Sequence, residues 1–311
     1  MKRALPLLSV DIENLRARTR TMIEKAGQTK DLRVSYLPSS IREFPVISAS
    51  HLPGKYHAPL PQLIIFRATS GLYYDLRRGP QRLLDEANRR FEEYARKIIN
   101  ARLPRFEVLK EQAYGTKKLP RKTPDVMIRD SGRIVAVIEC KATKLTFDAQ
   151  YAEDPANEAK SGYEQIANGI AQLWRFFSHA RRGIYTTEAV DPDAHGVLLS
   201  MDAWMQMSRN LQTHVFGRAE ELVANEPDVI TADKRRIIFA PVEELDDVLA
   251  ISDEDEFLAT LQAARDQKFN GWMLKNIRQQ LSETVPVRKP YPFHPKEFLP
   301  WWDRNNKLDC G

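Results

Sequence analysis

Cysteine is nearly missing from this 311-residue chain, which has only Cys140 and Cys310. Two cysteines cannot build a disulfide framework or a cysteine-based zinc site, so we expect a reducing, cytoplasmic setting. Long hydrophobic runs are missing too. Apolar runs such as 134–138 are far shorter than the roughly 20 residues that cross a bilayer, and Asp11 and Glu13 interrupt the apolar stretch near the N-terminus. These absences predict a soluble protein without a membrane partner.

Charge is present in quantity but is unevenly distributed. Residues 77–122 carry 14 Lys or Arg against 6 Asp or Glu, whereas residues 188–260 carry 5 basic against 17 acidic residues. A basic segment followed by an acidic one indicates either a face that binds a polyanion or two surfaces that attract each other or a second copy. Nucleic acid is therefore one expected partner, a homodimer or a partner subunit is the second, and ordinary solvated surface charge is the alternative to both.

Proline and periodicity predict three regions. Residues 1–78 are expected to form an irregular accessory region with a helix over 11–27 and a short strand over 63–67, because five prolines from Pro38 to Pro61 preclude a long helix. Residues 79–245 are expected to form the core. Residues 246–311 are expected to be a C-terminal region in which helices over 243–264 and 271–281 precede an irregular tail rich in proline and aromatic residues.

The core pattern alternates between helices and strands. Helical spacing of apolar residues predicts helices over 80–100, 158–181 and 202–224, while strand patterns occur at 106–112, 125–129, 133–141, 195–201 and 236–240. The order is one helix, three strands, then helix, strand, helix and strand. It predicts an α/β fold with a mixed central sheet flanked by helices.

Two charged residues end the most buried of these strands. The run Ile134–Ile138 is continuously apolar and leads directly into Glu139 and Lys141, which lie two residues apart and therefore on one face of the strand. A tight turn at 130–132 folds this strand back on the preceding one. With the turn centred on Ser131, Asp125 is expected opposite residue 137 and on the same face as Glu139.

Two carboxylates and an ammonium group in one place predict a particular chemistry. Carboxylate oxygens suit Mg²⁺ or Mn²⁺, which retain several waters and bind the phosphate oxygens of a substrate. Such a cation activates a water and neutralises phosphate charge, and a lysine beside it orients the water and stabilises developing charge. We expect Asp125 and Glu139 to hold the metal and Lys141 to assist the attacking water.

These residues resemble the PD-(D/E)xK nuclease superfamily. The match is Pro124-Asp125, a spacer of 13 residues that contains a hairpin, and Glu139-Cys140-Lys141. The resemblance covers residues 79–245 and implies the restriction-endonuclease-like αβββαβ core. One branch of the superfamily carries a Gln-x-x-x-Tyr signature on the following helix. This chain has Gly169 where that tyrosine would stand, so no subfamily is assigned.

The resemblance also implies an acidic residue on the first core helix. Glu92 and Glu93 are the candidates, and Glu92 borders the apolar stripe whereas Glu93 lies among basic residues on the solvated side. We therefore expect Glu92 to join the metal site, against the alternative that both are ordinary surface carboxylates. Gln165 stands where some members of the superfamily place a glutamine that touches the site or the DNA, against the alternative of an ordinary polar-face residue.

Four basic residues directly precede the motif, namely Lys117, Lys118, Arg121 and Lys122. Phosphate contacts are their expected role, and a solvated loop is the alternative. Taken together, the sequence predicts a metal-dependent nuclease that cleaves DNA phosphodiester bonds, most simply an endonuclease. The rival hypotheses are a catalytically silent member of the fold that binds nucleic acid or protein, and an RNA nuclease.

Overall fold

The computed structural model describes residues 5–27, 39–144, 159–203 and 209–297. The chain divides into two compact units, Met1–Ala87 with Leu145–Lys160, and Asn88–Lys144 with Ser161–Gly311. The division falls inside helix α5 (Gln81–Arg102). The boundaries expected from the sequence, near residues 78 and 245, stay a prediction.

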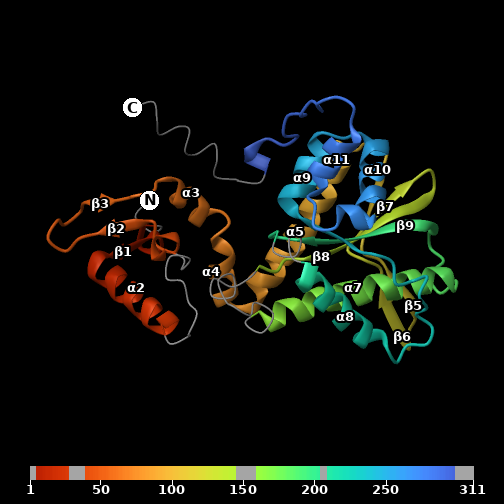
Figure 1. Cartoon of the computed structure of the whole chain (residues 1–311), viewed down its shortest axis with the longest axis horizontal. Coiled ribbons are helices and arrows are strands. Elements are labelled where there is room, and N and C mark those ends of the chain that lie inside the picture. Colours follow the sequence, from red (N-terminus) through yellow and green to blue (C-terminus); the bar gives the residue numbers. More distant parts are fainter. Residues whose placement is uncertain (1–4, 28–38, 145–158, 204–208, 298–311) are drawn as a thin grey trace. The chain divides into compact units, whose positions relative to one another are not determined.

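The N-terminal unit contains a small sheet in the order β1-β2-β3, in which β1 runs parallel and β3 antiparallel to β2 (Figure 1). Its elements are α1 (Leu5–Leu8), β1 (Ser9–Asp11), α2 (Ile12–Gly27), η2 (Ser40–Arg42), β2 (Val46–Ser48), β3 (Tyr56–His57), α3 (Gln62–Ala68) and α4 (Leu72–Arg78). Helix α2 confirms the helix expected over 11–27. The described part of the unit is more regular than its proline content predicts, because its prolines beyond residue 44 lie between elements.

The strand expected over 63–67 is wrong, because these residues belong to helix α3. Its apolar run is too short for a period of 2 to be distinguished from one of 3.6. The helix places Arg67 where its guanidinium donates two hydrogen bonds, of 2.7 and 2.9 Å, to the Asp75 carboxylate of α4. This bidentate pair buries Arg67 and fixes α3 against α4.

The second unit is built on a five-stranded sheet in the order β10-β9-β8-β7-β4. Strands β4, β7 and β8 are antiparallel neighbours, and β9 and β10 continue parallel to β8. The elements from α5 onward are β4 (Glu107–Lys110), β5 (Ala113–Thr116), β6 (Leu119–Lys122), β7 (Val126–Asp130), β8 (Arg133–Lys141), α7 (Lys160–Arg181), β9 (Ala189–Ser200), α8 (Arg209–Val223), β10 (Ile238–Pro241), α9 (Val242–Ala250), α10 (Glu254–Ala264), η4 (Gln267–Phe269), α11 (Leu274–Leu281) and η5 (Pro295–Glu297). The mixed α/β class and the expected order of core elements are confirmed.

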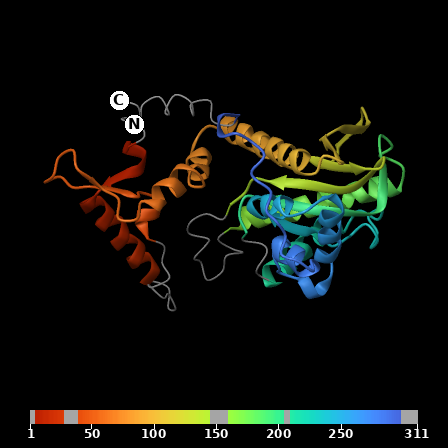
Figure 2. The ribbon, with the colours of Figure 1, turned by 90° about the horizontal axis from the view of Figure 1, so that it is seen from above.

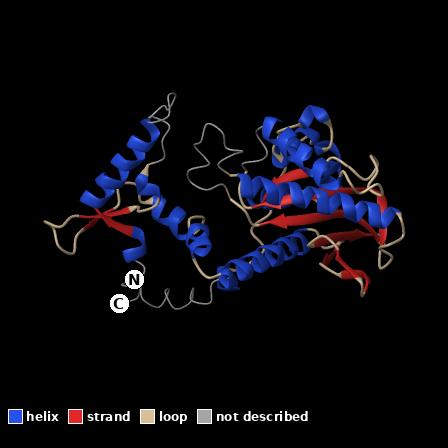
Figure 3. Ribbon diagram, turned by 90° about the horizontal axis from the view of Figure 1, so that it is seen from below, coloured by secondary structure: helices blue, strands red, loops and turns tan. Residues whose placement is uncertain are grey.

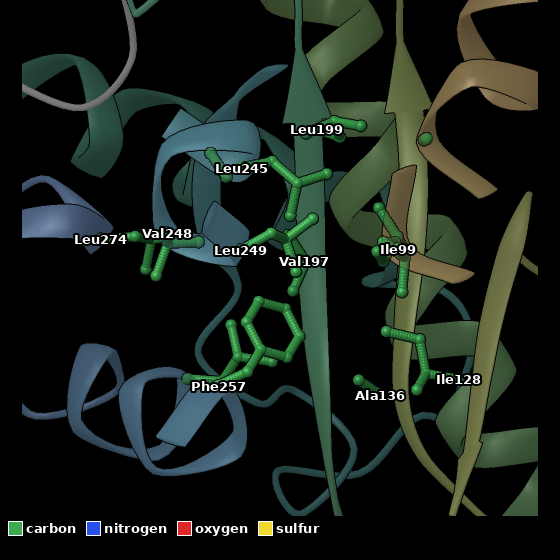
Figure 4. Close-up of a cluster of buried hydrophobic side chains, with 14 of the residues drawn as sticks. Ile99, Ile128, Ala136, Val197, Leu199, Leu245, Val248, Leu249, Phe257 and Leu274 are labelled. Atoms are coloured by element: carbon green, nitrogen blue, oxygen red, sulfur yellow. The ribbon is translucent and has the colours of Figure 1, made fainter. Parts of the chain in front are cut away.

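Helices cover both faces of this sheet (Figures 2 and 3). Helices α5, α9, α10 and α11 share one hydrophobic cluster with the strands, as Figure 4 shows for Ile99, Leu245, Leu249 and Phe257 around Val197. Helix α7 lies against the opposite face, and α8 packs on it through Trp174 and Phe216. Each fully buried aliphatic or aromatic side chain contributes about 1.5–3 kcal/mol, so this double-sided core fixes the strand ends that carry the charged motif.

Two segments depart from the expected pattern. In the sequence, an additional hairpin, β5–β6, follows β4 and precedes β7, where only a connection was predicted. The acidic helix expected over 243–264 is two helices, because Asp253 caps α10 in a reciprocal capping box with Glu256 and so starts a new helix. No helix in the described ranges has the length and apolar character needed to span a bilayer.

Candidate active site

The charged motif is positioned by the hairpin between β7 and β8. Ser131 and Gly132 both have positive φ, 49° and 79°, so they form a two-residue turn of the kind that matches strand twist. A β-bulge near Val135 then shifts the register, and Val126 pairs with Ile138. Continuing this register by one residue sets Asp125 opposite Glu139. The expected pairing of Asp125 with residue 137 is therefore wrong, because the turn has two central residues and the bulge adds another.

Three carboxylates stand in a row across three neighbouring strands. Lys110 pairs with Val126 and Val126 with Ile138, and Glu111, Asp125 and Glu139 are the residues next to these three at the same end of the sheet. The paired residues Val126 and Ile138 face the α5 side of the sheet, which places Asp125 and Glu139 on the α7 side. Asp125 is held by its Oδ2 atom, which accepts a hydrogen bond of 2.7 Å from the Cys140 backbone N–H.

Lys141 lies on the same face as Glu139, as the two-residue spacing predicted. Its Nζ donates a hydrogen bond of 2.7 Å to Glu139 Oε1 and a second one of 2.9 Å to Gln172 Oε1 on α7. The Glu139 side chain is only 7% exposed and that of Lys141 is 18% exposed. The pair therefore lies at the edge of the hydrophobic core, where few water molecules surround it and an ionic interaction is stronger than on the surface.

Helix α7 comes unusually close to these two side chains because residue 169 is glycine. A Cβ atom built at Gly169 would lie 2.8 Å from Lys141 Cε, 2.9 Å from Leu198 Cδ1 and 3.5 Å from Glu139 Cγ. The first two distances are closer than side chains tolerate. The departure from the Gln-x-x-x-Tyr signature at Gly169 thus has a local structural reason. Because glycine has no side chain, it leaves room for the side chains of Lys141 and Glu139.

The carboxylates of the site are difficult to ionise together. The pKa of Glu139 is raised to about 7: burial is the largest cause, the Lys141 charge opposes it, and the negative charges of Asp125 and Glu111 act in the same direction as burial. Burial also raises the pKa of Asp125, although the Cys140 N–H and the Lys141 charge act in the opposite direction. Carboxylates with raised pKa values in one place form a site that is stabilised by a cation or by protons.

Glu92 and Glu93 lie in the different surroundings that the helical pattern predicted. Burial, and then the negative charge of Asp125, raise the pKa of Glu92, which is half-buried on α5. Glu93 instead pairs with Lys97 at 2.8 Å and Arg89 at 3.1 Å, and these cations lower its pKa. The charge of Asp125 therefore acts on Glu92, which lies on α5, whereas Glu93 forms ion pairs with its neighbours along the helix surface.

The predicted phosphate-binding residues lie on or beside the β5–β6 hairpin. Lys117 and Lys118 form its exposed turn, and Arg121 and Lys122 lie on β6. Lys122 is directed to the carboxylate row, since its Nζ is 2.9 Å from Glu111 Oε1. The hairpin is fixed to the unit by Tyr114, whose hydroxyl is 2.7 Å from His179 Nδ1 of α7.

Gln165 is exposed on α7, two turns before Gln172. The two glutamines share one helix face, but only Gln172 has a hydrogen bond to the motif among the described residues. The sequence did not predict a place for Gln172 at the site. The structure therefore brings together Asp125, Glu139 and Lys141, sets Glu92 within the field of Asp125, and leaves Gln165 apart from them.

Glu111 is a further site residue that the sequence did not predict, and its charge is among those that raise the pKa values of Glu92, Asp125 and Glu139. Glu111 directly follows strand β4, and β4 pairs with β7, which begins directly after Asp125. The sequence predicts both strands, but no local pattern specifies the register between them, so it does not show that Glu111 approaches Asp125.

The donor set can be tested against the expected divalent cation. In the described ranges, no three His, Cys, Asp or Glu side chains are gathered closely enough to form a complete metal cage. Mg²⁺ does not require one, since it is commonly held by one or two carboxylates while waters and substrate phosphates complete its shell. The buried Glu139 and the half-buried Asp125 supply oxygen donors whose charges repel each other, and they fit that requirement.

No protein family, curated protein or solved structure compared with this chain matches it.

Proposed function

We propose that this chain is a metal-dependent nuclease that hydrolyses phosphodiester bonds in DNA, acting as an endonuclease. The observation that carries the proposal is the convergence of Asp125, Glu139 and Lys141 at one end of a sheet, with both carboxylates raised in pKa. The succession of α5, β4, β7, β8, α7 and β9 is similar to the αβββαβ core of restriction-endonuclease-like nucleases, which supports the same proposal.

In this proposal Asp125 and Glu139 hold Mg²⁺ or Mn²⁺, and Glu92 completes the site. When bound, such a cation lowers the pKa of a water and neutralises charge on the phosphate. Lys141 provides a positive charge next to Glu139, at the place where a phosphate oxygen or the attacking water would be stabilised. The Cys140 N–H keeps the Asp125 carboxylate oriented, so the site is organised before substrate arrives.

The basic residues of the β5–β6 hairpin would supply backbone contacts. Lys117 and Lys118 are exposed at its turn, and the hairpin borders the carboxylate row through the pair formed by Lys122 and Glu111. Cations in this position would bring a polyanion to the site and hold it there without reading its bases.

A substrate panel tests the proposal. Purified protein is incubated with supercoiled plasmid, linear duplex, single-stranded DNA and RNA, in Mg²⁺, Mn²⁺ or EDTA. Nicked or linearised plasmid with either metal and none with EDTA is the expected result. Shortening from ends alone would indicate an exonuclease, cleavage of RNA alone would indicate an RNA nuclease, and binding without cleavage would indicate a catalytically silent member of the fold.

A further inference from the structure

The ammonium group of Lys141 has three N–H donors, and two of them are committed within the protein. One goes to Glu139 Oε1 at 2.7 Å and the other to Gln172 Oε1 at 2.9 Å. Among the described residues the third donor has no acceptor, so a ligand can take it. We propose that Gln172 is a positioning residue that holds Lys141 so that this third N–H meets the scissile phosphate or its attacking water. The inference rests on the proposed nuclease function.

A second acceptor is needed because a lysine side chain is flexible. It has several rotatable bonds, and one hydrogen bond to Glu139 leaves the ammonium free to rotate about that contact. Gln172 approaches from α7 whereas Glu139 belongs to β8. Acceptors on two rigid elements fix the nitrogen in position and determine the direction of the remaining N–H.

The chemistry of an amide suits this role better than that of a carboxylate. The Gln172 carbonyl oxygen accepts a hydrogen bond but carries no net charge, so Lys141 keeps its positive charge for a phosphate. A carboxylate at residue 172 would add another negative charge close to the buried carboxylate of Glu139. It would also repel a polyanionic substrate.

Gly169 gives Gln172 its reach. The two residues are three apart and therefore lie on the same side of α7. With any side chain at Gly169, a Cβ would press on Lys141 Cε at 2.8 Å, and either the helix or the lysine would have to move. The close approach of α7 at Gly169 and the hydrogen bond from Lys141 to Gln172 therefore both determine the position of Lys141. A substitution at either residue alone should change that position.

The test uses Gln172→Met, which keeps side-chain length and helix propensity and removes the acceptor. Gln279→Met is the matched control, an exposed glutamine on α11. We expect Gln172→Met to lower kcat about tenfold, which corresponds to about 1.4 kcal/mol, with KM unchanged within about twofold. Gly169→Ala should lower kcat in the same way, because it displaces Lys141 without removing the amide. The control should match wild type.

A second measurement does not depend on cleavage. In metal-free protein with ¹⁵N-labelled lysine, the side-chain ¹H–¹⁵N signal of Lys141, assigned by its loss in Lys141→Arg, should be protected from exchange in wild type and Gln279→Met. It should broaden or disappear in Gln172→Met.

The outcomes separate the two proposals. An unchanged kcat in Gln172→Met, or a rise in KM alone, would overturn the positioning role while wild-type cleavage left the nuclease proposal standing. A Lys141 signal that is the same in Gln172→Met would overturn the hydrogen bond itself. Wild-type protein that cleaves nothing in the substrate panel would overturn the function and, with it, the role.

Discussion

Glu139→Gln should make the stability of the metal-free protein less dependent on pH. Glu139 is buried in wild type, and the pKa of its carboxyl is raised from an ordinary 4.5 to about 7. Each pKa unit is equivalent to about 1.4 kcal/mol, so the ionised carboxylate costs the folded state about 3 kcal/mol relative to the unfolded chain. Glutamine keeps the shape and the acceptor for Lys141 and cannot ionise.

The sign of the effect follows from the direction of the pKa change. A carboxyl with a raised folded-state pKa binds its proton more tightly when folded, so its contribution to stability is complete below pH 4.5. That contribution is lost as the pH rises from 4.5 through about 7. Between pH 4.5 and 8, wild type should therefore lose about 3 kcal/mol that Glu139→Gln does not lose.

Urea denaturation of metal-free protein, followed by tryptophan fluorescence, measures this difference, because Trp174 is buried on α7 in the same unit. The free energy of unfolding is determined at several pH values for wild type, Glu139→Gln and the control Glu93→Gln. Mg²⁺ added at pH 8 should stabilise wild type and have little effect on Glu139→Gln. Parallel pH profiles for wild type and Glu139→Gln would refute the reasoning, since they would mean that Glu139 titrates at its ordinary value.

Three further variants test other parts of the site. Glu92→Gln should lower cleavage about tenfold and raise the Mg²⁺ concentration required, because it removes a negative charge near Asp125 that would help to hold the cation. Glu93→Gln should cleave like wild type, and the reverse ranking would mean that the wrong carboxylate was assigned. Asp125→Asn should weaken Mg²⁺ binding in calorimetry, and unchanged affinity would remove it from the metal site. Lys117 and Lys118 changed together to Ala should reduce the slope of log affinity against log salt by about 0.9 for each lost duplex contact, whereas an unchanged slope would exclude phosphate contact.

The sequence predicted the elements that carry strong local signals. Apolar spacing identified helix α5, the strand run of Ile134–Ile138 identified β8, and the two-residue alternation identified the shared face of Glu139 and Lys141. These features depend on residues close together in the chain. A short apolar run such as Leu63–Phe66 is too short to show either a helical or a strand period, which is why its pattern predicts a strand where α3 lies.

The parts of the site that sequence could not predict depend on register and on close approach. The two-residue turn and the bulge near Val135 together move Asp125 from residue 137 to Glu139, and no local pattern marks the bulge. Glu111 and Gln172 reach the motif only through strand pairing and through the packing of α7 against β8. In the sequence, Gly169 is only the position where the Gln-x-x-x-Tyr signature would have a tyrosine. The structure explains the glycine, because the Lys141 side chain occupies the space that a side chain at residue 169 would need.

Cleavage of supercoiled plasmid in Mg²⁺ by wild type and Lys141→Ala tests the central claim most directly. The truncated variant should keep its fold, because Lys141 lowers the pKa of Glu139 and its loss lets the buried carboxyl take up a proton instead of remaining as an unpaired charge. Matching circular dichroism spectra would check this. The account predicts nicked or linear plasmid with wild type and none with Lys141→Ala. Equal cleavage rates for the two proteins would contradict it.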